Sequence, residues 1–341
     1  LYGERRAGRP GLGVAGGGVC VAATFDWAVA SASTPGQELP MKRAGSVSLG
    51  SPSRDKKVVI TLNGEQISVE RIGTGGDVPR AQRLFAELDG QVDCLSVGGV
   101  DLYLPIGGRR YPLKAALQLV KDVKHTPVVD GSGLKHTLER RVFELIRTQV
   151  GTLPHFRRAF VPVAVDRLGL AHAVSEVADE VILGDLMMAF GLPFPIYGLK
   201  SFYRVARLLM PLVSHLPIEM IFPPGYKDEP IRPKYEKIWA QCDLIAGDFL
   251  YMRKHLPNDL EGKFIITNTT TSENIDLFRQ RGARMLVTTT PVLDGRSFGT
   301  NMMEAALTAY AGLGRVLTYE ELNRKIEELD FRPTVQVLKA V

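Results

Sequence analysis

Short apolar runs alternate with amphipathic helical patterns along most of this chain, from Met41 to the end. The first helical stretch follows Asp77, a residue type that favours the N-cap, and places Ala81, Phe85 and Leu88 on one face. Alternation of short apolar strands with helices predicts a mostly parallel sheet covered by helices on both faces. We therefore expect an α/β protein with a Rossmann-like sheet domain.

The same pattern predicts individual strands and helices. The expected strands are Arg43–Leu49, Lys57–Leu62, Gln66–Ile72, Val92–Val97, Leu102–Pro105, Pro127–Val129, Phe160–Val165, Val181–Gly184, Asp243–Ala246, Phe264–Thr267 and Met285–Val287. The expected helices are 78–88, 113–123, 134–149, 169–177, 234–240 and 319–329. Asn63-Gly64 joins two of the strands and predicts a hairpin, because both residues tolerate a positive φ.

The break near Gly151–Pro154 predicts a domain boundary. Residues 41–152 are expected to form a smaller mixed-sheet α/β domain, and residues 153–341 the Rossmann-like domain, with a ligand crevice between them. Residues 1–40 are rich in Gly, Ala, Ser and Pro with little periodicity. We interpret them as a disordered leader or as translated upstream sequence before a natural start at Met41.

Composition and cysteine spacing argue against two kinds of site, one for nucleic acid and one for a metal ion. The 341 residues are 45% hydrophobic and 23% charged, with a net charge of +5 and no long basic tract, so a nucleic-acid partner is not expected. The three cysteines, Cys20, Cys94 and Cys242, are far apart and form no CxxC pair. They predict buried thiols in a cytoplasmic protein, and no metal site is expected because ligand clusters are absent.

Residues 186–222 form an unusually apolar segment that also carries Lys200, Arg204 and Arg207. Prolines interrupt it, and it contains no run of about 20 apolar residues, so no integral membrane segment is predicted. A buried helix or a homodimer face is the simpler interpretation. A helix that binds a partner or a membrane surface is the alternative.

The first candidate site is the turn Asp130-Gly131-Ser132-Gly133, which runs from a strand into a helix. Small residues let backbone amides approach an anion there. Lys135 and Asp130 are the candidate catalytic residues, as an acid/base pair around a substrate hydroxyl. The alternative is a tight turn in which Ser132 caps the helix.

The second candidate lies in the strand–helix–strand unit of residues 160–185. Asp185 follows the second strand, where a dinucleotide-binding fold places its ribose-binding acid. Asp166 and Arg167 precede the helix, and Arg167 is placed to meet a phosphate. Only Gly169 remains of the GxGxxG fingerprint, so a plain βαβ unit is the alternative.

The third candidate is a pair of Thr-rich strand ends, which the sequence places at the carboxyl edge of the sheet. The candidate cofactor-binding residues here are Asn268, Thr269, Thr288, Thr289 and Arg296. We expect the second strand end, with the Gly295–Asn301 loop behind it, to be the stronger phosphate site. Thr270 and Glu273 have the spacing of a capping box, which explains part of the first without a ligand. The polar loop Gly50–Asp55 also follows a strand, but exposed arginines are more often solvated.

Four segments together resemble a bacterial family labelled quinate 5-dehydrogenase. They are MKRAGSVSLGSPSRDKK, TPVVDGSGLKHTLERR, AGDFLYMRKHLPNDLEGK and ITNTTTSENIDLFRQRGARMLVTTTPVLDGRSFGTNMMEA. The resemblance runs from about Met41 to about Ala311. It implies an NAD- or NADP-dependent oxidation of a ring hydroxyl of a cyclic polyol acid such as quinate or shikimate.

The chain departs from the well-understood quinate and shikimate dehydrogenases in lacking their SxTxPxK motif, so their catalytic residues transfer to no position here. Lys135 and Asp130 take that role in our hypothesis. Two alternatives stay open. One is a protein that is not an oxidoreductase and binds a phosphorylated or nucleotide-like ligand, as a transferase or a sensor. The other is a scaffold that binds a partner or a membrane through residues 186–222.

Overall fold

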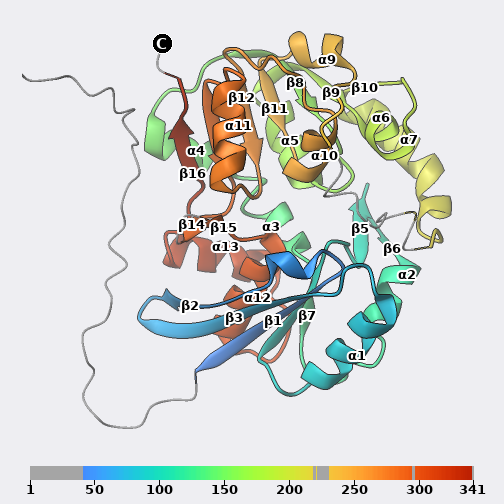
Figure 1. Cartoon of the computed structure of the whole chain (residues 1–341), viewed down its shortest axis with the longest axis vertical. Coiled ribbons are helices and arrows are strands. Elements are labelled where there is room, and N and C mark those ends of the chain that lie inside the picture. The colour runs from blue at the N-terminus through green and yellow to red at the C-terminus, as the bar shows by residue number, and fades with distance from the viewer. Residues whose placement is uncertain (1–40, 218–219, 221–229, 294–295, 340–341) are drawn as a thin grey trace, which may run out of the picture.

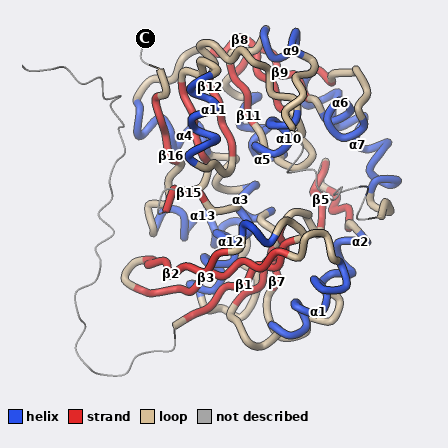
Figure 2. Tube along the Cα trace, in the orientation of Figure 1, coloured by secondary structure: helices blue, strands red, loops and turns tan. Residues whose placement is uncertain are grey.

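The computed structural model describes residues 41–217, 220, 230–293 and 296–339. The proposed leader, residues 1–40, lies outside these ranges. Two α/β lobes stack on each other, one around a sheet of N-terminal strands and one around a sheet from the second half of the chain (Figure 1). Figure 2 shows that helices cover both sheets. The predicted α/β fold class with largely parallel sheets is confirmed.

The first sheet has the strand order β2-β3-β1-β4-β7 in the described part of the chain. Its strands are parallel except for β2, which pairs antiparallel with β3. The predicted hairpin between these two strands is confirmed, with φ of 48° at Asn63 and 84° at Gly64. The bounds are β1 Lys42–Ser48, β2 Lys56–Leu62, β3 Glu65–Gly73, β4 Cys94–Gly98 and β7 Val128–Val129, with a separate hairpin β5 Tyr103–Ile106 and β6 Arg109–Pro112.

Helices from both ends of the chain cover the first sheet. α1 packs on one face, and α12 packs on the other with α3 and α13 beside it. The bounds are η1 Pro52–Arg54, α1 Val78–Leu88, α2 Lys114–Leu117, η2 Gln118–Val120, α3 Ser132–His136, α12 Thr300–Ala311 and α13 Tyr319–Glu328. One core cluster therefore joins residues 44–145 to residues 298–331. The predicted division at 152/153 stays a prediction, and the C-terminal helices lie on the N-terminal sheet.

The second sheet has the order β10-β9-β8-β11-β12-β13-β16, with antiparallel strands at its two edges and parallel strands between them. Its strands are β8 Phe156–Val161, β9 Ala178–Leu183, β10 Ile196–Tyr197, β11 Leu244–Ala246, β12 Phe264–Thr267, β13 Met285–Thr288 and β16 Thr334–Val337. A short hairpin, β14 Val292–Leu293 and β15 Arg296–Ser297, follows β13.

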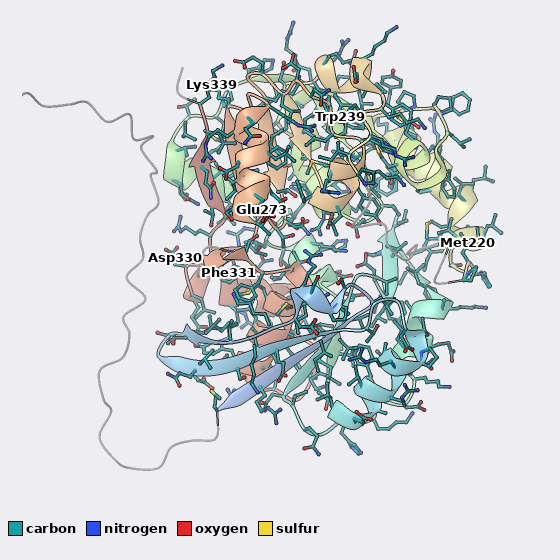
Figure 3. All side chains as sticks on the ribbon, viewed as in Figure 1. Met220, Trp239, Glu273, Asp330, Phe331 and Lys339 are labelled. Carbon is teal, nitrogen blue, oxygen red and sulfur yellow. The ribbon has the colours of Figure 1, made fainter. Side chains whose placement is uncertain are left out.

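Two helical layers cover the second sheet. The helices are α4 Val142–Val150, α5 Leu168–Ser175, α6 Asp185–Phe190, α7 Gly198–Val213, α9 Glu236–Ala240, α10 Phe249–Lys254 and α11 Ser272–Gln280. Side chains of β8 alternate between the two layers: Ala159 and Val161 join the core under α5 and α7, and Phe160 joins the core of Trp239 and Phe278. Figure 3 shows Trp239 within this lobe. Phe331, in the segment that returns the chain from α13 to β16, is also labelled there.

Each sheet has a point at which the strand order reverses. In the second sheet the chain leaves β8 for β9 on one side and later continues with β11 on the other side. In the first sheet β1 lies between β3 and β4 in the same way. Ligands of open parallel sheets bind outside the carboxyl ends of the strands at such points. The residues that follow β1, β4, β8 and β11 are therefore the first places to look for a site.

The helix expected over residues 134–149 is wrong in the structure, which contains two shorter helices, α3 and α4. The Thr137 hydroxyl donates to the Gly133 carbonyl oxygen (2.8 Å), and the Glu139 amide donates to the Leu134 carbonyl oxygen (3.1 Å). These bonds end the first helix and turn the chain. The turn carries Glu139 to full burial beside Arg167, a tertiary ion pair that the periodicity does not encode.

The apolar segment at 186–222 is described except for 218–219 and 221–222. It forms α6, β10 and α7, and α7 buries Phe202, Ala206 and Met210. Leu208 remains 79% exposed on the outer side. None of the described helices is both long enough and apolar enough to cross a membrane. A homodimer through this segment and a cytoplasmic location stay predictions.

Candidate functional site

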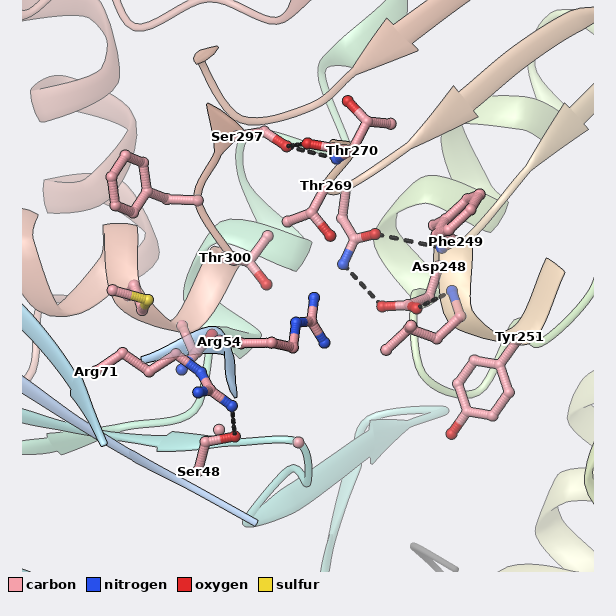
Figure 4. A pocket seen from close by; sticks show the side chains of 18 of the residues that line it. Ser48, Arg54, Arg71, Asp248, Phe249, Tyr251, Thr269, Thr270, Ser297 and Thr300 are labelled. Carbon is pink, nitrogen blue, oxygen red and sulfur yellow. Dashed lines mark hydrogen bonds between the residues drawn. The ribbon is translucent and has the colours of Figure 1, made fainter. Parts of the chain in front are cut away.

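The carboxyl ends of both sheets border one cleft of about 640 Å³. The first lobe contributes Ser48 at the end of β1, Gly98 at the end of β4 and Asp130 after β7. The second lobe contributes Arg167 after β8 and Asp248 after β11, together with residues 268–271 after β12. Figure 4 shows side chains from both lobes directed into this space. The reversal points of the two sheets thus meet at a single site.

Arginines from the first lobe form one wall of the cleft. Arg71 donates to Asp55 Oδ1 (2.7 Å) and to Ser48 Oγ (3.0 Å). Burial lowers the pKa of Arg71, and the positive charge of Arg54 lowers it further. Arg54 itself projects into the middle of the cleft (Figure 4), and its guanidinium has no partner among the described residues. Two repelling cations at a cleft create a place where an anion is favoured.

An ordered set of polar groups forms the opposite wall. Asp248 caps α10 by accepting from the Leu250 amide (2.8 Å), and its other oxygen accepts from Asn268 Nδ2 (2.7 Å). Asn268 Oδ1 accepts from the Phe249 amide (3.4 Å). Thr269 points into the cleft, as Figure 4 shows. Carboxylate, amide and hydroxyl groups of this kind bind hydroxyl groups of a ligand.

A buried charge cluster forms the floor of the cleft. Lys135 Nζ lies 2.6 Å from Asp101 Oδ1 and 2.9 Å from Asp166 Oδ1. Next to it, Arg167 pairs with Glu139, with Asp166 (3.3 Å) and with Asp248 (2.9 Å). Asp248 also belongs to the opposite wall of the cleft, so it links the floor to that wall.

The protonation states in this cluster follow from burial and pairing. Burial raises the pKa of Asp101 to about 7, although the Lys135 ammonium opposes the shift. Burial lowers the pKa of Lys135, but the two carboxylates outweigh it and the net direction is upward. For Asp166, Lys135 and Arg167 outweigh burial and hold the pKa below its usual value. At neutral pH the lysine is charged, and Asp101 is the carboxyl of this cluster whose pKa is raised toward neutral pH.

The proposed pair of Lys135 and Asp130 does not form. The Asp130 carboxylate accepts from the Leu102 amide (2.6 Å) and from the Ser132 amide (3.0 Å), so it holds two turns together. Lys135 points instead to Asp101 and Asp166. The reason is the αL geometry at Gly131, with φ of 95°, which turns the chain between Asp130 and the helix.

The candidates of the βαβ unit separate in space. Asp166 and Arg167 line the cleft. Asp185 lies behind it, where its carboxylate accepts from the Ala164 amide (3.1 Å) and the Val165 amide (2.8 Å), and burial raises its pKa to about 6. At Gly169 an added Cβ would lie 2.0 Å from the Lys135 carbonyl oxygen. This glycine therefore serves close packing of α5 on α3.

The two Thr-rich strand ends have different surroundings. Asn268 and Thr269 line the cleft, whereas Thr288 and Thr289 are buried outside its lining, and Thr289 Oγ1 donates to Glu139 Oε1 (3.1 Å). Of the second site, Thr288 and Thr289 do not face the cleft, but Ser297–Asn301 of the loop behind them line it. Arg296 begins β15, but its side chain lies outside the described residues.

The expected capping box at Thr270 and Glu273 is also wrong. Thr271 caps α11 by accepting from the Asn274 amide (3.4 Å).

Sequence reasoning missed Arg54 and Arg71 as functional candidates, whereas Thr300 lies in the Gly295–Asn301 loop that it singled out. Arg54 lies in the Gly50–Asp55 loop. The only sequence signal for a site there is that this polar loop follows a strand. Arg71 sits within a strand pattern, and nothing in its neighbourhood marks it. Thr300 begins α12, and only the packing of α12 on the first sheet brings it to the cleft.

Two family models match the chain, and both are domains of unknown function: DUF8753 over residues 43–130 and DUF8754 over residues 133–338. No curated protein sequence matches it.

Several solved structures show remote similarity. A Mycobacterium smegmatis protein in complex with β-D-fucofuranose has 13% identity and a TM-score of 0.33, over 81% of this chain and 87% of that one. An ABC transporter solute-binding protein from Burkholderia multivorans has 8% identity and a TM-score of 0.33, over 88% and 100%. Malic enzyme from Entamoeba histolytica has 9% identity and a TM-score of 0.37, over 82% and 60%.

These findings correct the expected identity. The resemblance to quinate 5-dehydrogenase is wrong: both matching family models are domains of unknown function, and neither is a dehydrogenase family. The dehydrogenase activity inferred from the resemblance is therefore wrong as well. The role of Asp185 as a ribose ligand stays a prediction. The NAD or NADP cofactor stays an untested prediction. The chain belongs to the family whose model covers residues 133–338, the domain of unknown function DUF8754.

Proposed function

We propose that this protein binds a small anionic metabolite, phosphorylated or nucleotide-like, in the cleft between its two sheets. The observation that carries the proposal is the Arg54 guanidinium, which projects into the cleft without a partner among the described residues. A cation held beside a second cation, Arg71, gains from a bound anion. A ligand anion supplies that partner.

The size and lining of the cleft support a metabolite. A volume of about 640 Å³ lies within the range of roughly 300–1,000 Å³ that small-molecule sites occupy. The wall opposite Arg54 offers Asp248, Asn268 and Thr269, which suit hydroxyl groups. Basic groups on one side and acceptors on the other favour a ligand that is both anionic and rich in hydroxyl groups.

The test is calorimetric titration with sugar phosphates and nucleotides, each paired with its unphosphorylated parent. We expect at least one phosphorylated compound to bind and to raise Tm, because a ligand that binds only the folded state stabilises it. Its parent should bind more weakly.

The variant Ser53→Trp tests whether the ligand binds in this cleft. Ser53 is an exposed residue at the rim, so a bulky side chain there should obstruct the cleft and abolish binding. Glu87→Trp, on the exposed side of α1 and outside the cleft, is the control. Binding of no phosphorylated compound, or unchanged binding to Ser53→Trp, would refute the proposed function.

A further inference from the structure

The start of α12 is a second polar feature of the cleft. α12 spans 12 residues, and its N-cap is Gly299, which has no side chain with which to cap the helix. Its first intrahelical bond runs from the Met303 amide to the Gly299 carbonyl oxygen (3.1 Å), so the amides of the first turn have no partner within the helix. Together with the helix dipole, such amides attract an anion.

Thr300 gives independent evidence for a ligand at this position. The residue is only 3% exposed, its hydroxyl has no hydrogen-bond partner among the described residues, and Figure 4 shows the hydroxyl directed into the cleft. A hydroxyl that opens onto a cleft can donate to an acceptor bound there. A ligand oxygen in the cleft would therefore be the natural partner of Thr300 Oγ1.

The start of α12 is packed closely against Gly131 and is fixed to the first sheet. An added Cβ at Gly131 would lie 2.9 Å from Thr300 Oγ1 and 2.8 Å from the Asn301 amide nitrogen. Asn301 Nδ2 donates to Ser46 Oγ (3.0 Å) and Ser96 Oγ (3.2 Å), which fixes the helix start on β1 and β4. The first turn of α12 is therefore positioned by the sheet before any ligand arrives.

Positive charge converges on the same end of the cleft. Lys56 Nζ lies 4.9 Å from the ring centroid of Phe298, just before α12, and Arg54 lines the cleft with it. Two acidic groups of the first lobe are engaged elsewhere: Asp55 with Arg71, and Asp130 with two backbone amides. No carboxylate of the described residues neutralises Arg54.

We infer that this end of the cleft is a phosphate subsite, in which the first turn of α12, Thr300 Oγ1 and the Arg54 guanidinium bind a phosphate monoester. The ligand's hydroxyl groups then face Asp248 and Asn268. The inference rests on the proposed function and adds to it the chemical class of the anion and the direction in which the ligand lies.

Inorganic phosphate is the direct probe, followed by ³¹P NMR or calorimetry. The full chain should bind phosphate, and Arg54→Gln should weaken binding by roughly tenfold or more, as loss of a charged hydrogen bond does. Thr300→Val keeps the shape of the side chain and should weaken binding by a smaller factor. Arg80→Gln, on exposed α1, should bind as the unchanged protein does. Unchanged Tm without ligand shows that the variants fold.

Ribose 5-phosphate against ribose, and AMP against adenosine, distinguish a sugar phosphate from a nucleotide as the source of the phosphate. Phosphate binding that is equal in Arg54→Gln, Thr300→Val and the unchanged protein overturns the inference. If a metabolite still binds in a manner blocked by Ser53→Trp, the proposed function stands and only the subsite fails. If nothing binds, both fail.

Discussion

Glu304 is a buried acid that forms no ion pair with any residue in the described part of the chain. It lies on α12, 3% exposed, and accepts from the Leu134 amide (3.3 Å) at the start of α3. Burial raises its pKa to about 8, and the nearby Asp130 adds to the shift. At neutral pH the folded protein therefore holds Glu304 mainly as the neutral acid, which links α12 to α3 by a hydrogen bond rather than by charge.

This pKa makes stability depend on pH with a defined sign. Below about pH 4.5, the ordinary value, Glu304 is protonated in both the folded and the unfolded chain. Between about 4.5 and 8 the unfolded chain loses this proton while the folded chain keeps it, so this group lowers stability as pH rises. Above about pH 8 the contribution of Glu304 to the free energy of unfolding no longer changes with pH.

Glu304→Gln should remove this dependence, because glutamine keeps the acceptor oxygen and does not ionise. The variant should be more stable than the unchanged protein, and this stability difference should be larger at pH 9 than at pH 5 by on the order of a few kcal/mol. Each unit of pKa shift corresponds to about 1.4 kcal/mol. Urea unfolding at the two pH values measures the difference. Glu87→Gln, exposed on α1, is the control. An equal stability difference at both pH values would contradict the assignment.

At the scale of elements, the turn from β7 into α3 determines how closely α12 can approach. Gly131 combines φ of 95° with contact to the start of α12, so its conformation and its lack of a side chain are both required. The same turn aims Asp130 away from Lys135 and toward the Leu102 amide. One glycine thus influences the cleft floor and the proposed phosphate subsite.

Gly131→Ala should destabilise the protein by about 3 kcal/mol, the sum of a strained backbone and an overpacked contact. Gly64→Ala separates the two causes: its φ is 84°, but nothing lies within 4 Å of the added Cβ. That variant should lose only about 1–2 kcal/mol. Chemical denaturation measures both. Equal losses in the two variants would show that contact with α12 contributes nothing.

At the scale of the molecule, the first lobe is built from two distant parts of the chain. Ile67, Val69 and Leu134 share a core with Met303 and Leu322, which lie on α12 and α13. An N-terminal piece without these helices exposes one face of its sheet, and the hydrophobic effect then favours collapse or association over a unique fold.

A fragment of residues 41–152 should therefore lack a cooperative unfolding transition and fixed side-chain packing. The same fragment joined by a flexible linker to residues 298–331 should recover both. Near-ultraviolet circular dichroism and urea unfolding compare the two. Cooperative unfolding of residues 41–152 alone would show that the first lobe does not depend on the C-terminal helices.

Local sequence determines much of this fold. The β2–β3 hairpin, the strand at Phe264–Thr267 and the capped helix at 319–328 follow from period-two and helical patterns and from turn chemistry at Asn63 and Thr318. The same reasoning placed Asn268 and Thr269 at a strand end that lines the cleft. These features are predictable because a few neighbouring residues specify them.

Tertiary structure alone decided which groups meet. Lys135 pairs with Asp101, 34 positions earlier, rather than with nearby Asp130, and Asn301 reaches Ser46 across 255 positions. Arg54 gains significance only because the two lobes face each other across the cleft. Periodicity and spacing report local geometry, whereas ion pairs and clefts depend on how sheets and returning helices pack. The sequence by itself thus determined the α/β elements and one ligand-facing strand end, and only the packed structure assembled the site.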